Sequence, residues 1–178
     1  MNTAFFQREP EAADRERWRA EIAAAPADPS QNGRFMLFVF RVGGERFGIE
    51  PAHVDLAAPL PGIHSIPHRG VSVAGVVNVR GTVTLCFSLA DVLGCAPGPS
   101  AERPMLLVLS HGGWRVACRV DAAEGVSSFV QSDLQSPPST LQATARTHIK
   151  GIFDSGNGTG IGWLDVTSLF GAFDAATR

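Results

Sequence analysis

Short runs of β-branched and aromatic residues, joined in pairs by glycines, constrain the fold of this chain more than any other feature. The run RFMLFVFRV leads through two glycines into ERFGIE, and PMLLVLS leads through HGG into WRVACRV. Glycine adopts the positive φ that tight hairpin turns require, so each pair predicts a β-hairpin. The first hairpin should open with a strand over residues 35–42. The second should contain strands over residues 105–110 and 114–120, and its similarity to the first predicts two similar small sheets.

Two further strands are expected in VSVAGVVNVRG and TVTLCFSL. Gly75 interrupts the first of them and indicates a β-bulge or a close approach of two backbones, whereas Gly81 indicates a turn. Strands this short, at near-regular spacing, favour barrels or a sandwich over a parallel α/β sheet. The fold class predicted by these patterns is therefore mainly β.

Short helices complete the predicted domain. The stretch PAHVDLAAPL predicts a helix over residues 51–58, ended by two nearby prolines. SLADVLG predicts one or two helical turns followed by Gly94. DVTSLFGAF predicts a terminal helix from Val166, with the carboxylate of Asp165 as its cap.

A separate N-terminal extension is expected before this domain. Residues 10–25, PEAADRERWRAEIAAA, predict a helix because a proline suits its first turn and Trp18 with Ile22 forms an apolar stripe. The PADPSQNG segment that follows is rich in proline, serine, asparagine and glycine, as linkers are. We therefore expect an extension over residues 1–33 and a domain of two halves with a C-terminal helix over residues 34–178.

Composition and charge exclude several classes of function. Of the 178 residues, 44% are apolar, which is enough for a globular core. Fifteen lysines and arginines against 17 aspartates and glutamates leave a formal charge of -2, so no net attraction draws the protein to nucleic acid or an acidic membrane. Three cysteines without a C-x-x-C spacing indicate reduced thiols. The charged N-terminus and the lack of a long apolar run predict a cytoplasmic protein without a membrane-inserted segment.

Candidate residues for catalysis or metal binding are few. His64 and His68 have an H-x-x-x-H spacing, but Pro67 between them prevents the helix that would align both imidazoles. The GNGTGIG stretch lacks the lysine and the spacing of a phosphate-binding loop. Cys86 and Cys118 lie in apolar runs, where a thiol packs as a small hydrophobe. We therefore expect no catalytic residue, no metal and no cofactor, and keep two alternatives: a small β-barrel sensor or enzyme using the histidine loop, and a nucleic-acid-binding barrel.

One arginine stands out in an otherwise apolar stretch. VSVAGVVNVRGTVTLCF contains a single formal charge, Arg80, beside a single amide, Asn78. Arginine is rarely buried without a partner. Its guanidinium is therefore either held inside the protein, by a salt bridge or as a cap on backbone carbonyls, or directed at a partner. Together with an ample core and few active-site candidates, this indicates an interaction module.

Several stretches resemble, in order and spacing, the CheW-like family of bacterial chemotaxis coupling proteins. They are FVFRVGGERFGIE, LPGIHSIP, AGVVNVRGTVTLCFSLADVLG, CRVDAAEGV, IKGIF and WLDVTSLF, and they extend from about residue 35 to residue 170. The resemblance implies two small five-stranded SH3-like β-barrels packed together and a scaffold without catalysis. Members of the family bridge the cytoplasmic tips of transmembrane chemoreceptors to the regulatory domain of the histidine kinase CheA. For this chain it implies a cytoplasmic adaptor recruited to membrane-associated receptor arrays.

The resemblance also implies a set of partner-binding residues. Arg80 matches the family arginine implicated in receptor and kinase coupling, with Asn78, Val79 and Gly81 setting the end of its strand. Val54 matches a valine on a barrel face that is associated with partner binding.

Three positions depart from the family pattern. Leu56 stands where an acidic residue is usual, Leu85 where a proline is usual, and Ser88 where an aspartate is usual. The change to serine keeps a helix-capping side chain but removes a charge. These departures suggest a diverged paralogue that serves a dedicated, non-flagellar chemosensory pathway.

Overall fold

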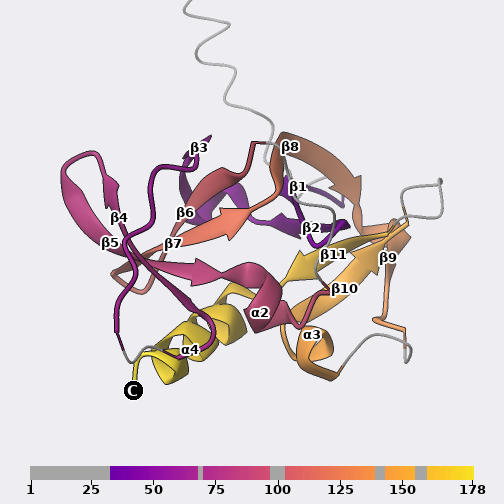
Figure 1. Ribbon diagram of the computed structural model, residues 1–178. Coiled ribbons are helices and arrows are strands. Elements are labelled where there is room, and N and C mark those ends of the chain that lie inside the picture. The colour runs from indigo at the N-terminus through magenta and orange to yellow at the C-terminus, as the bar shows by residue number, and fades with distance from the viewer. Residues whose placement is uncertain (1–32, 68–69, 97–102, 139–142, 155–159) are drawn as a thin grey trace, which may run out of the picture.

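The computed structural model describes residues 33–67, 70–96, 103–138, 143–154 and 160–178. The helix expected over residues 10–25 and nearly all of the expected linker lie outside the described residues. Within them the fold is mainly β, with two sheets and short helices (Figure 1). This confirms the predicted fold class.

The two sheets contain all of the described strands. The six-stranded sheet has the order β8 (Ala122–Val130), β1 (Arg34–Val42), β2 (Glu45–Ile49), β11 (Ile161–Leu164), β10 (Ile149–Phe153) and β9 (Leu134–Gln135). The five-stranded sheet has the order β3 (Val54–Pro59), β6 (Met105–His111), β7 (Trp114–Val120), β5 (Thr82–Ser88) and β4 (Val73–Val79). The described helices are α2 (Leu89–Leu93), α3 (Ala143–Thr147) and α4 (Val166–Ala176), with single 3-10 turns η2 (Pro51–His53) and η3 (Gln131–Asp133).

Both predicted glycine hairpins are confirmed. Strands β1 and β2 pair up to Val42 and Glu45, and the two glycines between them have φ of 63° and 86°. Strands β6 and β7 pair up to His111 and Trp114 across two glycines with φ of 58° and 80°. Each sheet therefore contains one of the two similar hairpins.

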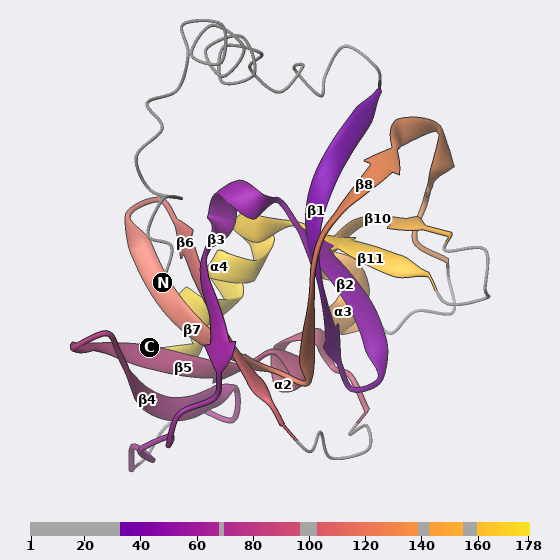
Figure 2. The same ribbon diagram turned by 90° about the horizontal axis from the view of Figure 1, so that it is seen from above.

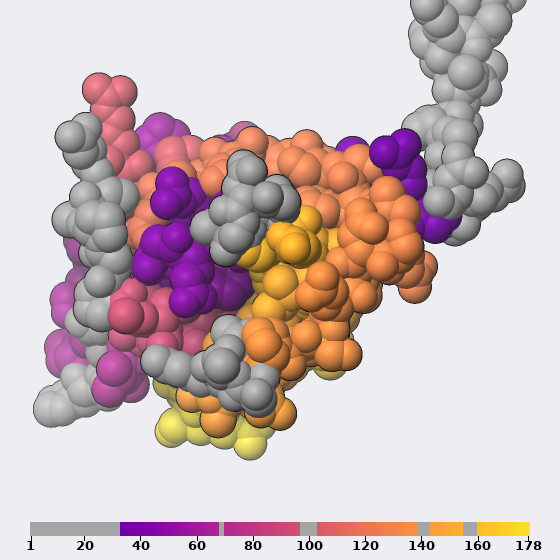
Figure 3. All heavy atoms as spheres, turned by 90° about the vertical axis from the view of Figure 1, so that its right-hand side faces the viewer, coloured from indigo at the N-terminus to yellow at the C-terminus, as the bar shows by residue number. Residues whose placement is uncertain are grey.

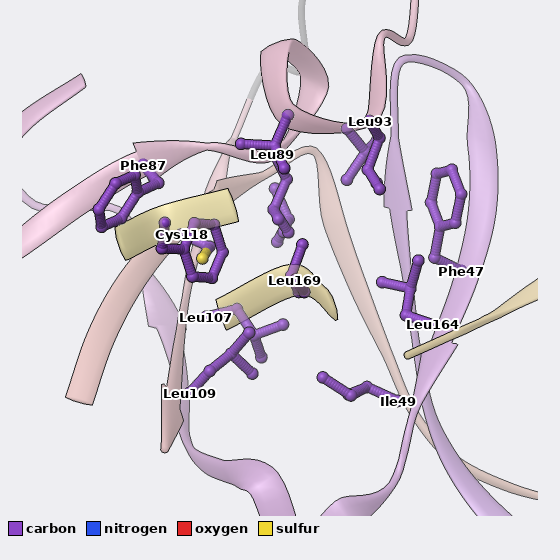
Figure 4. Close-up of a cluster of buried hydrophobic side chains, with 14 of the residues drawn as sticks. Phe47, Ile49, Phe87, Leu89, Leu93, Leu107, Leu109, Cys118, Leu164 and Leu169 are labelled. Carbon is purple, nitrogen blue, oxygen red and sulfur yellow. The ribbon is translucent and has the colours of Figure 1, made fainter. Parts of the chain in front are cut away.

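Alternating side chains divide the core into three clusters. Leu37 and Val39 of β1 point into a small cluster inside the six-stranded sheet, whereas Phe40 and Val42 join the large central cluster between the sheets. A third cluster lies inside the five-stranded sheet and includes residues from β4, β5, β6 and β7. In the central cluster, Leu169 of α4 lies between side chains of the two sheets (Figure 4). Because burying one such side chain stabilises a fold by roughly 1.5–3 kcal/mol, this cluster holds the two sheets together.

The predicted helix over residues 51–58 is wrong. A single 3-10 turn is followed directly by β3, which pairs with β6 from Val54↔Leu109 to Pro59↔Met105. In this strand Leu56 packs against the cluster inside the five-stranded sheet, and Ala57 packs against the central cluster. A strand places neighbouring residues on opposite faces, so it buries both side chains where a helix would bury one.

The other two predicted helices of the domain are confirmed. Helix α2 ends at Gly94, which has φ of 66° and takes the left-handed conformation typical of the position after a helix. Helix α4 begins at Val166, and the Asp165 carboxylate accepts a hydrogen bond from the Thr167 N–H at 3.1 Å. None of the helices in the described ranges is long and apolar enough to cross a membrane.

Gly75 is both a bulge and a point of close backbone approach, as its sequence position indicated. The pairing of β4 with β5 shifts between Val73 and Gly75, whose φ is 148°. The segment containing His64 crosses β4 here, and a Cβ atom at position 75 would lie 2.3 Å from the His64 carbonyl oxygen. The His64 and Val76 backbones exchange two hydrogen bonds of 2.9 Å. The bulge thus lets the loop that contains His64 pair closely with β4, the edge strand of the five-stranded sheet.

Candidate functional site

Arg80 lies at the tip of the hairpin formed by β4 and β5. The strands pair up to Val79 and Thr82, which leaves a two-residue turn of Arg80, with φ of 51°, and Gly81, with φ of 87°. Positive φ at both central residues is what a type I′ turn requires. Among the described residues, Arg80 is the one non-glycine residue with positive φ. The hairpin projects from one side of the molecule, on the left of Figure 1 and Figure 2.

The neighbours of Arg80 hold this turn in place. The Asn78 side-chain oxygen accepts a hydrogen bond from the Gly81 N–H at 2.7 Å. Val79 is 3% exposed and packs in the cluster inside the five-stranded sheet. Asn78 therefore fixes the turn, Val79 anchors it, and the exposed Arg80 is presented at its tip.

The Arg80 guanidinium does not show the internal role that was considered as an alternative. Within the described ranges, no hydrogen bond or ion pair engages this side chain. The basic side chains of Arg46, Arg115 and Lys150, by contrast, pair with carboxylates at the surface. Arg80 is thus available to a group outside the described residues.

Val54 lies on a different part of the sheet from Arg80. It begins β3, one edge strand, whereas Arg80 follows β4, the other edge strand. The β3–β6 register shifts between Val54 and Leu56, so Val54 packs against the central cluster while Leu56 packs against the cluster inside the sheet. The residue between them, Asp55, is exposed and accepts hydrogen bonds from the Ser110 hydroxyl at 2.7 Å and from Arg115 Nε at 3.1 Å. The predicted partner residues Val54 and Arg80 therefore do not share one contact cluster.

A hollow that we name the β5/β7 notch lies beside β5, the second strand of the Arg80 hairpin. Its volume is about 370 Å³, and it is lined by Thr82, Val83, Thr84, Leu85, Phe87, Gly113, Trp114, Arg115 and Val116. The notch exists because the parallel pairing of β5 with β7 begins at Cys86↔Ala117, after both strands have started. The side chains of Val83 and Trp114 are 72% and 48% exposed.

Sequence reasoning missed the exposed residues of this notch. Trp114 follows a glycine turn at the first position of its strand, where a large apolar side chain gains little from the core. This position, directly after a glycine turn, could have indicated from the sequence that the Trp114 side chain is exposed. Leu85, one of the departures from the family pattern, lines the notch and packs against the central cluster. Ser88, another departure, caps α2 through a hydrogen bond from the Asp91 N–H to its hydroxyl oxygen at 3.4 Å.

A second hollow, of about 340 Å³, lies on the six-stranded sheet. It is lined by residues of β2, β10 and β11, including Phe47, Ile149 and Gly162. A Cβ atom at position 162 would lie 3.2 Å from Phe47 Cδ1, so a glycine at this position keeps the hollow open. Figure 3 shows this side of the molecule, where indigo atoms from the start of the domain lie beside orange to golden atoms from the region of β10 and β11. The hollow contains no residue from the predicted partner set.

The buried thiols of the described residues are shifted away from reactivity. Burial raises the pKa of the Cys86 thiol to about 11, against a smaller opposing effect of Arg119, and burial raises the pKa of Cys118 as well. Thiols with such pKa values are protonated and unreactive at neutral pH. His64 is exposed, and His68 lies outside the described residues. No group of three or more possible metal ligands forms within the described ranges.

An exposed cation on a hydrogen-bonded turn, on a two-sheet β scaffold, is an arrangement that suits a protein-interaction module. The chain belongs to the CheW-like domain family, whose model matches residues 36–173. This confirms the resemblance seen in the sequence and makes the chain a CheW-like adaptor of the chemotaxis type. CheW proteins of this family are scaffolds or adaptors.

Relatives in three bacteria support the assignment. The probable chemotaxis protein CheW of Rhizobium etli is 26% identical over 116 residues, covering 65% of this chain and 75% of that protein. The chemotaxis protein CheW of Rhizobium meliloti is 26% identical over 121 residues, and that of Bacillus subtilis is 23% identical over 121 residues; each alignment covers 68% of this chain and 78% of the relative.

A solved structure supports the fold. The crystal structure of the scaffolding protein TtCheW from Thermoanaerobacter tengcongensis superposes with a TM-score of 0.65 and 19% sequence identity, covering 76% of this chain and 92% of that chain.

Proposed function

We propose that this protein couples chemoreceptors to a CheA-type histidine kinase in a chemosensory array. Its partners would be the cytoplasmic tips of the receptors and the regulatory domain of the kinase, and it would be recruited from the cytoplasm to the membrane-associated array. The observation that carries the proposal is the exposed Arg80, held at the tip of a rigid hairpin in a CheW-like domain. The names of the chemotaxis relatives support it.

The hairpin suits this role for a physical reason. A guanidinium forms strong, charge-assisted hydrogen bonds with carboxylates and carbonyl oxygens. The Asn78 hydrogen bond to Gly81 and the burial of Val79 fix the backbone beneath it before binding. Little conformational entropy of the backbone is then lost on association. The function requires no titrating or nucleophilic group.

We also propose that the array is a dedicated, non-flagellar one. Two of the departures from the family pattern, Leu56 and Leu85, are half-buried apolar side chains that pack against the clusters of the domain. Where the family usually has an acidic residue, this protein therefore offers no charge from position 56. A partner that normally meets that charge would need a different surface.

Binding measurements on both partners test the function. A receptor tip fragment and a kinase regulatory domain from the same organism would be titrated with the full chain, with Arg80→Ala and with Arg34→Ala as a matched exposed control. We expect the Arg80 variant to bind at least one partner about tenfold more weakly, because a charged hydrogen bond contributes roughly 1.5–3 kcal/mol. The Arg34 variant should bind as the wild type does.

Two results would overturn parts of this proposal. If the wild type binds neither partner, the coupling function is wrong. If Arg80→Ala binds both partners as tightly as the wild type, the function stands and the site is elsewhere.

The proposed division of the chain has its own test. We propose that residues 34–178 form the CheW-like domain and residues 1–33 an extension, in line with the family match over residues 36–173. A chain lacking residues 1–33 should unfold in one cooperative transition with the midpoint of the full chain. A broad or lost transition would show that Trp18 and Ile22 belong to the core.

A further inference from the structure

Two histidines from distant parts of the sequence meet at one end of the five-stranded sheet. His53 is the last residue of η2, directly before β3, and His111 is the last residue of β6. The pairing of β3 with β6 places Val54 opposite Leu109, which brings the two imidazoles side by side. Their ring centroids lie 5.2 Å apart, with the ring planes at 73°. No spacing in the sequence links these histidines, because the strand pairing alone brings them together.

A hydrogen bond fixes the tautomer of His53. Its Nδ1 lies 3.1 Å from the Ser110 carbonyl oxygen. A carbonyl oxygen can only accept a hydrogen bond, so Nδ1 carries the proton and Nε2 of the neutral ring keeps a free lone pair. Histidines that ligate a metal almost always donate their other ring N–H to a carbonyl or a carboxylate in this way. His53 is therefore prepared to ligate a metal through Nε2.

The ring of His111 is packed against an aromatic side chain. Its centroid lies 5.4 Å from that of Phe170, a residue of α4 that belongs to the central cluster. Within the part of the chain that the structure describes, no hydrogen bond occupies the ring nitrogens of His111. Both histidines are half-buried, so an ion from the solvent can reach them while Phe170 closes one side.

The separation of the two rings suits one tetrahedral ion. Zinc binds an imidazole nitrogen at about 2.0–2.1 Å, so two imidazoles on one tetrahedral zinc have ring centroids about 5 Å apart. Asp55, the neighbouring carboxylate, already accepts hydrogen bonds from the Ser110 hydroxyl and from Arg115. No third histidine, cysteine or carboxylate joins the pair in the described ranges. The pair therefore offers two protein ligands and leaves two coordination positions open.

We propose that His53 and His111 bind one Zn²⁺ ion. His53 coordinates the ion through Nε2, His111 coordinates it through a ring nitrogen, and water completes the tetrahedron. Structural zinc sites have four protein ligands, so this two-ligand site adds to a domain that folds without metal. The proposal does not depend on the coupling of receptors to a kinase.

Calorimetric titration with zinc chloride tests the site. The metal-free full chain would be compared with His53→Gln, His111→Gln and, as a matched control, His64→Gln, which changes another histidine of the domain. We expect the wild type to bind one ion per chain. His53→Gln and His111→Gln should each weaken zinc binding by about tenfold or more, because even the loss of an outer-shell partner of a ligand has an effect of that size. His64→Gln should bind zinc as the wild type does.

Nitrogen resonances of the imidazole rings identify the ligating atoms without any substitution. In ¹⁵N-edited NMR spectra of the wild type, zinc should shift Nε2 of His53 and leave its Nδ1 protonated. The resonances of His64 should not move. The proposal is wrong if the wild type binds no zinc, or if His53→Gln binds it as tightly as the wild type. It is also wrong if His64→Gln weakens binding as much as His53→Gln, because the ion would then bind in the loop that contains His64.

Discussion

Replacing Arg80 by asparagine should stabilise the fold while it weakens partner binding. Arg80 has φ of 51° in a two-residue turn ahead of Gly81. The left-handed conformation destabilises the folded state by about 1–2 kcal/mol for a residue with an ordinary side chain. Asparagine before glycine, by contrast, is the sequence that such turns prefer. We therefore expect Arg80→Asn to raise the free energy of unfolding by about 0.5–1 kcal/mol. For a chain of this length that corresponds to a rise in melting temperature of about 1–4 °C.

Thermal melts and partner titrations on the same preparations check this prediction. Binding of the receptor tip or the kinase regulatory domain should fall about tenfold in the variant that melts at the higher temperature. Arg34→Asn serves as the control, because Arg34 is exposed in β1 and has no positive φ, so its replacement should not raise stability. A lower melting temperature for Arg80→Asn would refute the reasoning. It would mean that the arginine side chain contributes to the fold.

Three further predictions concern the fold and its ionisable groups. Gly75→Ala should lower the free energy of unfolding by about 3 kcal/mol or more, because the new Cβ would lie 2.3 Å from the His64 carbonyl oxygen; an equally stable variant would refute the close approach. Cys86 and Cys118 should react with a thiol reagent at pH 8 only as fast as the protein unfolds, because both side chains are 0% exposed and burial also raises both pKa values. Burial also lowers the pKa of His148, so the unfolded chain binds the proton more readily and stability should fall as the pH drops below about 6.5. His148→Gln should show a smaller fall between pH 7.5 and pH 5 in urea unfolding, and an unchanged slope would contradict the shift.

Features that depend on neighbouring residues could be predicted from the sequence. The glycine pairs of the two hairpins, Gly94 after α2 and Asp165 before α4 were all placed correctly. Positive φ and helix capping are local requirements, because the residues that satisfy them lie within a few positions of one another. The turn at Arg80 and Gly81 is another feature that depends only on neighbouring residues. Its geometry follows from an arginine and a glycine between two β-branched strands.

Features that depend on contacts between distant strands could not be predicted in the same way. PAHVDLAAPL was expected to be helical, yet pairing with β6 makes it a strand that packs Leu56 and Ala57 against two different clusters. The register shift beside Asp55 then turns Val54 toward the central cluster. No residue near Asp55 in the sequence predicts this register shift, because the shift depends on which residues of β6 lie opposite β3.

The sequence by itself determined the mainly β class, the resemblance to the CheW-like family and the turn at Gly81 beside the arginine. Each of these follows from periodicity, turn chemistry or motif order along the chain. The tertiary structure decided where the pairing of β5 with β7 ends, and therefore that Val83 and Trp114 line one notch. The physical reason is that parallel strands meet through a long connection, so their register is set by the packing of both sheets around the central cluster.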